Sequence, residues 1–124
     1  MLRKFAISAA VVVLSAGAGA FVASSPAQAD SAVGCRYPRV CFYLTDGDWD
    51  DKVPSASYQD VTSTWQTLGR GGRGAFIMHN TRNDDVAYVH FTNGRTACAS
   101  PNGGVNLRAF GTADKVRISS SATC

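Results

Sequence analysis

The chain has 124 residues, of which 45% are hydrophobic and 17% are charged, and its formal net charge is +3. This length accommodates one domain, since folded domains mostly hold about 100–150 residues. A charge this close to zero argues against a nucleic-acid-binding protein of the usual strongly basic kind.

The first 29 residues have the pattern of a secretory signal peptide. Arg3 and Lys4 form a positive start, residues 5–23 are apolar or small, and Ala27-Gln28-Ala29 fits the small-x-small cleavage pattern. Removing them leaves 95 residues with ten basic and nine acidic side chains, so the net charge falls to +1. Nothing after residue 30 approaches the roughly 18 apolar residues of a membrane span. We therefore expect one extracellular domain over residues 30–124, with no membrane segment and no nucleic-acid partner.

The composition after residue 30 indicates a β-rich fold. All nine acidic residues of the chain are Asp, and Lys52 and Lys115 are the only lysines in this part. Glu and Lys are frequent on exposed helix surfaces, so their scarcity argues against a helical protein. Most of the 12 glycines also lie here, where they favour turns between short strands. We expect an all-β fold.

Apolar or alternating segments, separated by turn residues, predict short strands along this part of the chain. They lie at residues 40–45, 75–81, 86–91, 95–99, 105–110 and 115–119. The first strand is expected to stop at a turn over residues 46–48, and residues 49–69 to be irregular apart from at most one short helix. Asn93-Gly94 predicts a hairpin with a type I′ turn, because both residues tolerate a positive φ. About seven short strands predict a small sandwich or barrel.

Residues 69–74, with the sequence Gly-Arg-Gly-Gly-Arg-Gly, form a glycine-rich run. The run lacks the Gly-Lys-Ser/Thr ending of a phosphate-binding loop, and no helix pattern follows it. We interpret it as a mobile surface loop, whose Arg70 and Arg73 side chains are available to an acidic partner.

The four cysteines, Cys35, Cys41, Cys98 and Cys124, all lie after the expected signal peptide. An even number of cysteines in a short exported chain predicts a disulfide framework. Three pairings are possible. The short turn-like segment between Cys35 and Cys41 favours a local bridge, which leaves Cys98 to pair with Cys124. Because the cysteine and histidine spacing does not match a zinc site, we predict no metal.

The close cysteine pair, followed by the aromatic pair Phe42-Tyr43 just after the signal peptide, resembles the opening of the actinobacterial metalloproteinase-inhibitor family. Residues 79–81 and 86–88 look like that family's central hairpin. The resemblance implies a secreted, disulfide-bonded protein with the βγ-crystallin fold, which consists of two Greek-key motifs packed as a sandwich.

A faint internal repeat fits two such motifs. Residues 42–47 and residues 89–94 both end a strand with Thr, a turn-forming residue and Gly, and they are 47 residues apart. Two similar Greek-key motifs in a domain of this size would have that spacing.

The resemblance also implies a function, the inhibition of an extracellular peptidase by a rigid loop that occupies its cleft. Our candidate inhibitory segment consists of Ala97, Cys98, Ala99, Ser100 and Pro101. Cys98 would tether this segment, and Pro101 restricts the residue before it to extended conformations. We expect a monomer without a cofactor. The alternatives are an antimicrobial or cell-surface-binding module on the same fold, and a small hydrolase.

Catalytic machinery is not evident in the sequence. The only histidines, His79 and His90, can approach each other on adjacent hairpin strands, but a hydrolase also needs a nucleophile oriented by such a base. We predict that the protein is not an enzyme. Asp50-Asp51 and residues 83–85 are interpreted as turns rather than calcium ligands. Trp49, which lies among aspartates, is expected to be partly exposed.

Overall fold

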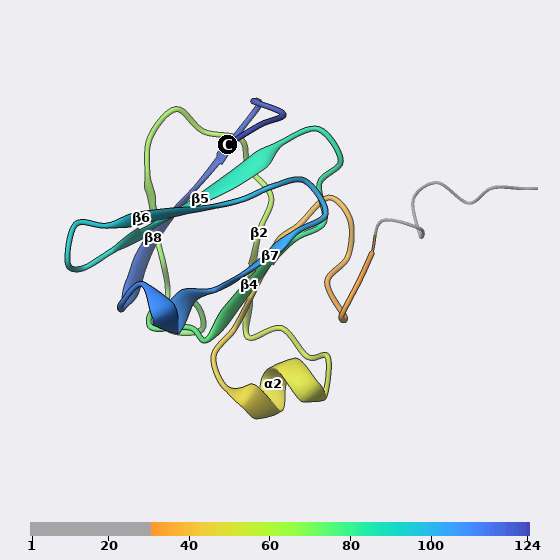
Figure 1. Cartoon of the computed structure of the whole chain (residues 1–124). Helices are drawn as coiled ribbons and strands as arrows, with labels where there is room; N and C mark the ends of the chain where they lie inside the picture. The colour runs from red at the N-terminus through yellow and green to blue at the C-terminus, as the bar shows by residue number, and fades with distance from the viewer. Residues whose placement is uncertain (1–30) are drawn as a thin grey trace, which may run out of the picture.

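Two antiparallel sheets form the protein in residues 31–124, the part of the chain that this computed structural model describes (Figure 1). Residues 1–29, the expected signal peptide, lie outside the described residues. No helix in the described part is long and apolar enough to cross a membrane. The predicted all-β, disulfide-bonded class is confirmed, since nearly all regular structure here is strand and both predicted disulfides are present.

The first sheet has the strand order β2-β1-β4-β7, and the second has the order β3-β8-β5-β6. The strands are β1 Val40–Tyr43, β2 Ala56–Tyr58, β3 Gln66–Thr67, β4 Ile77–Asn80, β5 Val86–Phe91, β6 Thr96–Ala99, β7 Gly104–Asn106 and β8 Ala113–Ser119. The α-helix α2 spans Asp46–Asp50, and the 3-10 helix η1 spans Leu107–Ala109. Every pairing within the two sheets is antiparallel.

The two halves of the chain exchange one strand each. β1, β2 and β4 form the first sheet together with β7, whereas β5, β6 and β8 form the second sheet together with β3. β1, β2 and β4 thus correspond to β5, β6 and β8, the strands four places further along the chain, and β7 corresponds to β3, four places earlier. The repeat at residues 42–47 and 89–94 begins in β1 and β5, which hold equivalent places. Neither half can complete its sheet without the other.

The main core lies between the sheets and is filled by alternate residues of the central strands. In β5, Ala87, Val89 and Phe91 are fully buried, whereas Tyr88 and His90 between them are half-buried on the outer face. Burying each large apolar side chain stabilises the fold by about 1.5–3 kcal/mol. The buried apolar residues of this core are Val40, Phe42, Leu68, Ala75, Met78, Ala87, Val89, Phe91, Ala97, Ala99, Leu107, Ala113, Val116 and Ile118.

The helix α2 lies where the sequence predicted a turn. Its N-cap is Thr45, whose hydroxyl accepts a hydrogen bond from the Asp48 N–H at 3.1 Å, while the Asp48 carboxylate accepts from the Thr45 N–H at 3.2 Å. This reciprocal capping box stabilises even a short helix. Residues 49–69 contain β2 and β3, so the expectation of an irregular segment is wrong. Both are short edge strands whose pairing depends on tertiary contacts.

Residues 79–81 and 86–88 do not form the expected hairpin. β4 and β5, the strands that contain most of them, belong to different sheets. Residues 81–85 are therefore a crossover between the sheets. The local pattern of strand, turn and strand is the same for a hairpin and a crossover, so the sequence alone did not distinguish them.

The hairpin predicted at Asn93-Gly94 is present between β5 and β6, but its turn differs from the expected type. Of these two residues, Gly94 alone has a positive φ, of +84°. Asn93 acts through its side chain, whose Oδ1 accepts from the Arg95 N–H at 3.0 Å and whose Nδ2 donates to the Phe110 carbonyl at 2.8 Å. The result is a short loop over residues 92–95, with Gly94 in the left-handed position.

The strand predicted at residues 105–110 is shorter than expected. β7 ends at Asn106, whose side-chain Oδ1 accepts a hydrogen bond from the Arg108 N–H at 3.1 Å. This contact caps the helix η1, which begins at the next residue. A side chain that bonds the backbone two residues ahead competes with strand pairing.

Candidate functional site

A buried asparagine at the end of β4 holds two surface segments together. The Asn80 side chain is fully buried, and its Oδ1 accepts a hydrogen bond from the Arg82 N–H at 3.0 Å. Its Nδ2 donates to three carbonyl oxygens at 2.9, 3.3 and 3.3 Å, those of Asp85, Ala99 and Ser100. Because both polar atoms of the amide are paired, the side chain avoids the cost of an unsatisfied buried group.

The two segments also contact each other directly. The Asn102 N–H donates to the Arg82 carbonyl at 3.0 Å, and Asn102 Nδ2 donates to Asn83 Oδ1 at 3.0 Å. Asn102 has a φ of +57°, a conformation that Asn tolerates better than most residues. We refer to residues 81–85 and residues 100–103 together as the paired turns.

The structure places the predicted inhibitory segment partly in a strand and partly in the paired turns. Ala97, Cys98 and Ala99 belong to β6, where the two alanines are 7% and 1% exposed. Ser100 and Pro101 follow the strand, and Ser100 is exposed whereas Pro101 is half-buried. The alanine side chains face the core, so the turn is the part of this segment that a partner can reach.

The disulfide between Cys98 and Cys124 is present as predicted, with the Cα atoms 6.0 Å apart. It fastens the last residue of the chain to the edge strand β6, and Cys124 Sγ lies 3.8 Å from the Ser100 hydroxyl. On the chain-entropy model, a ring of this length stabilises the fold by about 3.6 kcal/mol. The paired turns therefore have a covalent anchor next to them.

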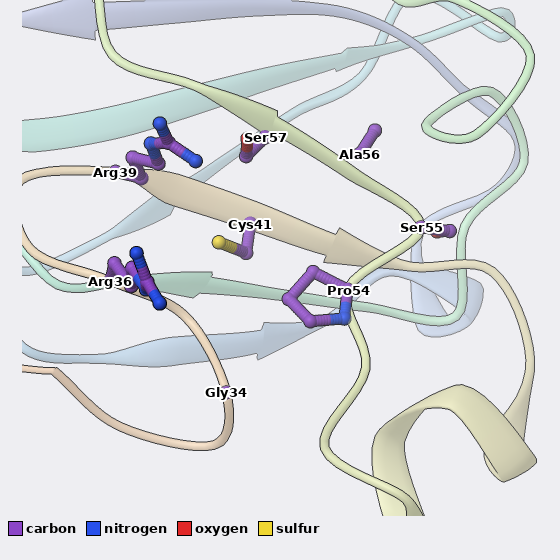
Figure 2. A pocket seen from close by; sticks show the side chains of 8 residues that line it. All are labelled: Gly34, Arg36, Arg39, Cys41, Pro54, Ser55, Ala56 and Ser57. Atoms are coloured by element: carbon purple, nitrogen blue, oxygen red, sulfur yellow. The ribbon is translucent and has the colours of Figure 1, made fainter.

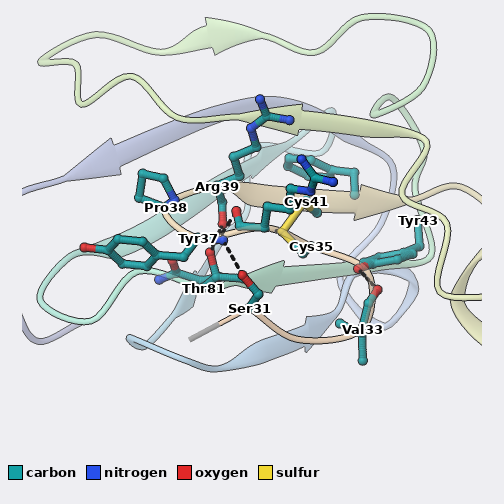
Figure 3. The surroundings of a disulfide bond; sticks show 12 residues. Ser31, Val33, Cys35, Tyr37, Pro38, Arg39, Cys41, Tyr43 and Thr81 are labelled. Atoms are coloured by element: carbon teal, nitrogen blue, oxygen red, sulfur yellow. Dashed lines mark hydrogen bonds between the residues drawn. A yellow bond between two sulfur atoms is a disulfide. The ribbon is translucent and has the colours of Figure 1, made fainter. Parts of the chain in front are cut away.

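The disulfide between Cys35 and Cys41 is also present as predicted. It fastens residues 31–37 over the outer face of the first sheet (Figure 3), where a second, smaller cluster is buried. The Tyr43 hydroxyl donates a hydrogen bond to the Val33 carbonyl at 2.5 Å, and burial raises the pKa of Tyr43 to about 12. The cluster consists of Cys35, Cys41 and Tyr43, against which Val33, Trp49 and Ile77 pack.

Trp49 is half-buried, as expected, and it packs against this cluster. Its ring packs edge-on against the Tyr43 ring, with the centroids 5.0 Å apart. Such edge-to-face aromatic pairs stabilise proteins by about 0.5–1.5 kcal/mol beyond their burial. The contact gives Trp49 a structural role in covering Tyr43.

An open groove of about 380 Å³ runs between residues 34–39, here called the N-terminal segment together with residues 31–33, and β2 (Figure 2). The side chains of Arg36 and Arg39 lie at the same end of it, and both residues are exposed. Within residues 31–124, neither guanidinium group forms an ion pair. Two unpaired guanidinium groups can bind an anionic group. The lining residues are Gly34, Arg36, Arg39, Cys41, Pro54, Ser55, Ala56 and Ser57.

The two histidines do not approach each other, because β4 and β5 lie in different sheets. His79 is opposite Cys41 and Gly104 in its sheet, and burial lowers its pKa. His90 Nδ1 lies 2.6 Å from Asp114 Oδ1, beside an irregularity in the pairing of β5 with β8. Among the described residues, neither histidine is hydrogen-bonded to a hydroxyl group. The nucleophile–base contact of a hydrolase is thus not seen there.

The glycine-rich run at residues 69–74 forms a turn at the surface and packs closely against Ser55. The Ser55 hydroxyl donates to the Gly71 carbonyl at 2.6 Å, and Gly72 is buried. A Cβ atom on Gly71 would lie 2.1 Å from the Ser55 carbonyl oxygen. Glycine is needed here for close backbone approach. Arg70 and Arg73 of the run are exposed.

The two aspartate clusters considered as calcium ligands, Asp50-Asp51 and residues 83–85, lie in different surroundings. Asp50 ends the helix α2 and Asp51 is its C-cap, whereas residues 83–85 belong to the paired turns. In the part of the chain that the structure describes, no group of three or more His, Cys, Asp or Glu residues is placed to hold a metal ion.

The sequence named Asn80 only as part of residues 79–81, and it did not single out the stacked group of Trp65, Tyr88 and Arg117, in which the Arg117 guanidinium group lies against both rings. A signal for Asn80 existed, because Asn80 and Met78 are the buried positions of the alternating strand β4, and a polar residue at a core position requires internal partners. The stacked group had no local signal. Its three residues come from separate segments and meet only where β3, β8 and β5 lie side by side.

Among protein-family models, curated proteins and solved structures, none matches this chain. Its function must therefore be inferred from the chemistry of its own surfaces.

Proposed function

We propose that the chain is a secreted protein that inhibits an extracellular metallopeptidase by placing residues 100–103 of the paired turns in the cleft of the enzyme. The observation that carries this proposal is the buried Asn80 side chain, which hydrogen-bonds both turns from inside. A segment that is already ordered loses little conformational entropy on binding. Rigidity of this kind favours inhibition over cleavage.

The crystallin-like pair of Greek keys is part of the same proposal. It is supported by the two interchanged sheets, in which each half of the chain gives one strand to the sheet of the other half. Secretion is supported by the two disulfides, because such bonds form and persist in oxidising compartments. The signal-peptide pattern of residues 1–29 is consistent with this location.

Inhibition would proceed by occupancy of the cleft. Ser100 is exposed, and the carbonyl of the same residue accepts hydrogen bonds from Asn80 and from the Gly103 N–H. If the enzyme cut the chain between residues 100 and 103, β6 and the Cys98–Cys124 disulfide would hold one new end, and β7 would hold the other. Products that cannot leave block the cleft and allow the bond to re-form.

The test is steady-state inhibition of secreted metallo-, serine and cysteine peptidases by the oxidised protein. Ser100→Arg places a large charged side chain on the turn, and it should weaken inhibition of a metallopeptidase at least tenfold, or about 1.4 kcal/mol. The matched control is Thr92→Arg, because Thr92 is exposed on the hairpin loop at the other end of β6. Equal inhibition by both variants would place the contact elsewhere, and inhibition of none of the three classes would reject the proposal.

The groove beside Arg36 and Arg39 favours a second candidate function, binding to an anionic cell-surface polymer. Both arginines are exposed and lack an ion-pair partner in the described part of the chain. Binding of this kind is electrostatic and weakens as salt is added. We expect the protein to be retained on immobilised dextran sulfate, and the double variant Arg36→Gln/Arg39→Gln to elute at lower salt. Elution of the variant at the same salt concentration as the wild type would exclude this groove as the polymer-binding site.

A further inference from the structure

Arg117 is held between two aromatic rings on the outer face of the second sheet. Its guanidinium carbon lies 5.2 Å from the centroid of the Trp65 ring and 5.1 Å from that of Tyr88. The strand order explains the arrangement, because β8 lies between β5, which carries Tyr88, and β3, which Trp65 directly precedes. Stacking on two rings fixes the position of a side chain that is otherwise flexible.

Arg117 nevertheless donates no hydrogen bond to any residue between 31 and 124. Its Nε is buried and has no partner among the described residues. Two other ring-stacked arginines do have acceptors. Arg95 stacks on Phe110 and also donates to the Phe110 carbonyl. Arg108 stacks on Phe76 and also pairs with Asp46. Arg117 is ordered by stacking as they are, yet it donates to no protein acceptor in this part of the chain. A guanidinium group that donates to no protein acceptor leaves its accessible N–H donors free for a ligand that supplies acceptor atoms.

A solvent-open depression of about 430 Å³ lies beside Arg117. Its remaining lining residues are Val61, Thr62, Ser63, Ser119 and Ser120, so most of them carry a hydroxyl group and none is acidic. The nearest aspartate on the same strand, Asp114, contacts His90 instead.

The wall of the depression is held in place by Gln66. Its side-chain Nε2 donates to the Asp60 carbonyl at 3.1 Å and to the Thr62 hydroxyl at 3.4 Å. The Thr62 hydroxyl itself donates to the Thr64 carbonyl at 2.7 Å, which leaves the serine hydroxyls as the donors available to a ligand. The depression is thus formed by a segment with its own hydrogen bonds.

We propose that this depression binds a tetrahedral oxyanion, a sulfate or phosphate group, through the Arg117 guanidinium group and the hydroxyls of Ser63, Ser119 and Ser120. A guanidinium group presents parallel N–H donors that match two oxygens of such a group. The hydroxyls donate to the remaining oxygens, and the stacking of Arg117 means that little side-chain entropy is lost on binding. Because the depression is open, the anion can be a free ion or the charged group of a sugar.

The experiment follows the side-chain N–H signals of Arg117 and Trp65 by NMR in the oxidised protein. The probes are sodium sulfate, sodium phosphate, glucose 6-sulfate and glucose 6-phosphate, each compared with sodium chloride at equal ionic strength. We expect saturable shifts of both signals with sulfate or phosphate and none with chloride. Tighter binding of a sugar ester than of the free ion would identify the group as part of a glycan, whereas equal binding would identify the free ion.

Two variants separate the site from general charge effects. Arg117→Gln should weaken oxyanion binding at least tenfold, whereas the control Arg108→Gln, which also removes a ring-stacked arginine, should leave it unchanged. Ser119→Ala keeps Arg117 and should weaken binding several-fold, which tests the site even if Arg117→Gln does not fold. Equal shifts with chloride and sulfate would overturn the proposal. So would oxyanion binding that is unchanged in Ser119→Ala and also unchanged in a folded Arg117→Gln variant.

Discussion

Asn80 Nδ2 donates a hydrogen bond to the main-chain carbonyl of Ser100 at 3.3 Å, across 20 residues of sequence. An inward-facing residue of the first sheet thus determines the position of an exposed residue that follows the edge strand of the second sheet. The same side chain bonds the crossover between the sheets. The stability of the core and the shape of the paired turns therefore depend on one amide group.

Replacing that amide should affect both properties. We expect Asn80→Ala to lower the free energy of unfolding by about 2–3 kcal/mol, because buried carbonyl groups lose their donor. The change should be measured by urea denaturation, together with the rate of proteolytic cutting between residues 100 and 103. A loss below about 1 kcal/mol, with no faster cutting, would show that the turns are ordered by other contacts.

Adjacent residues of β6 and the turn should respond very differently to the same substitution. Ala99 is 1% exposed, so Ala99→Asp buries an unpaired carboxylate and should cost about 3 kcal/mol or more. Ser100 is exposed, and Ser100→Asp should change stability by less than about 1 kcal/mol. Thermal melts of the two variants give the comparison. Similar melting temperatures would contradict the inward orientation of Ala99.

The Cys35–Cys41 disulfide should control the ionisation of Tyr43. Burial under the N-terminal segment raises the pKa of Tyr43 from 10.0 to about 12. Replacing both cysteines by serine should release that segment and return the pKa of Tyr43 toward 10.0, as followed by ultraviolet absorbance titration. The corresponding double replacement of Cys98 and Cys124 is the control, because that disulfide lies beside the paired turns, and it should leave Tyr43 unchanged.

Stability should decline in mild acid because of His79. Its pKa in the folded protein is lowered below 6.5 by burial, so below that pH the unfolded chain binds a proton that the folded chain binds less readily. The stabilisation is present above pH 6.5 and is lost as the pH falls toward the lowered pKa. His79→Gln should flatten this part of the stability curve, measured by urea denaturation at several pH values. A curve as steep as that of the wild type would assign the effect to other groups.

Substitution of two glycines by alanine should change the stability of the fold in opposite directions. A Cβ atom on Gly71 would lie 2.1 Å from the Ser55 carbonyl oxygen, so Gly71→Ala should destabilise the fold by about 2 kcal/mol or more. Gly47 lies inside the helix α2, and a Cβ atom there meets only the Thr45 hydroxyl, at 3.7 Å. Gly47→Ala should therefore stabilise by about 0.5–1 kcal/mol. Differential scanning calorimetry would report both changes, and stabilisation by Gly71→Ala would contradict the close packing of this run.

The sequence by itself determined the β-rich class, the positions of most strands and both disulfides. The strands have local signals, because apolar residues recur at every second position in strands such as β5 and β8 and turn residues separate the strands. The disulfides follow by elimination, because the short segment between Cys35 and Cys41 favours a local bridge and leaves Cys98 to pair with Cys124. For the candidate site, the sequence identified Ser100 and Pro101 as part of an extended segment beside a tethered cysteine. It did not show that the neighbouring alanines face inward.

Only the tertiary structure decided how the strands associate and which side chains meet. Residues 81–85 cross between sheets instead of closing a hairpin, because β4 and β5 each pair with strands distant in the chain. The partners of Asn80 and the two rings around Arg117 likewise come from separate strands and loops. Contacts of this kind depend on the complete sandwich, since no local segment contains both partners and the stabilisation arises only when the two halves pack together.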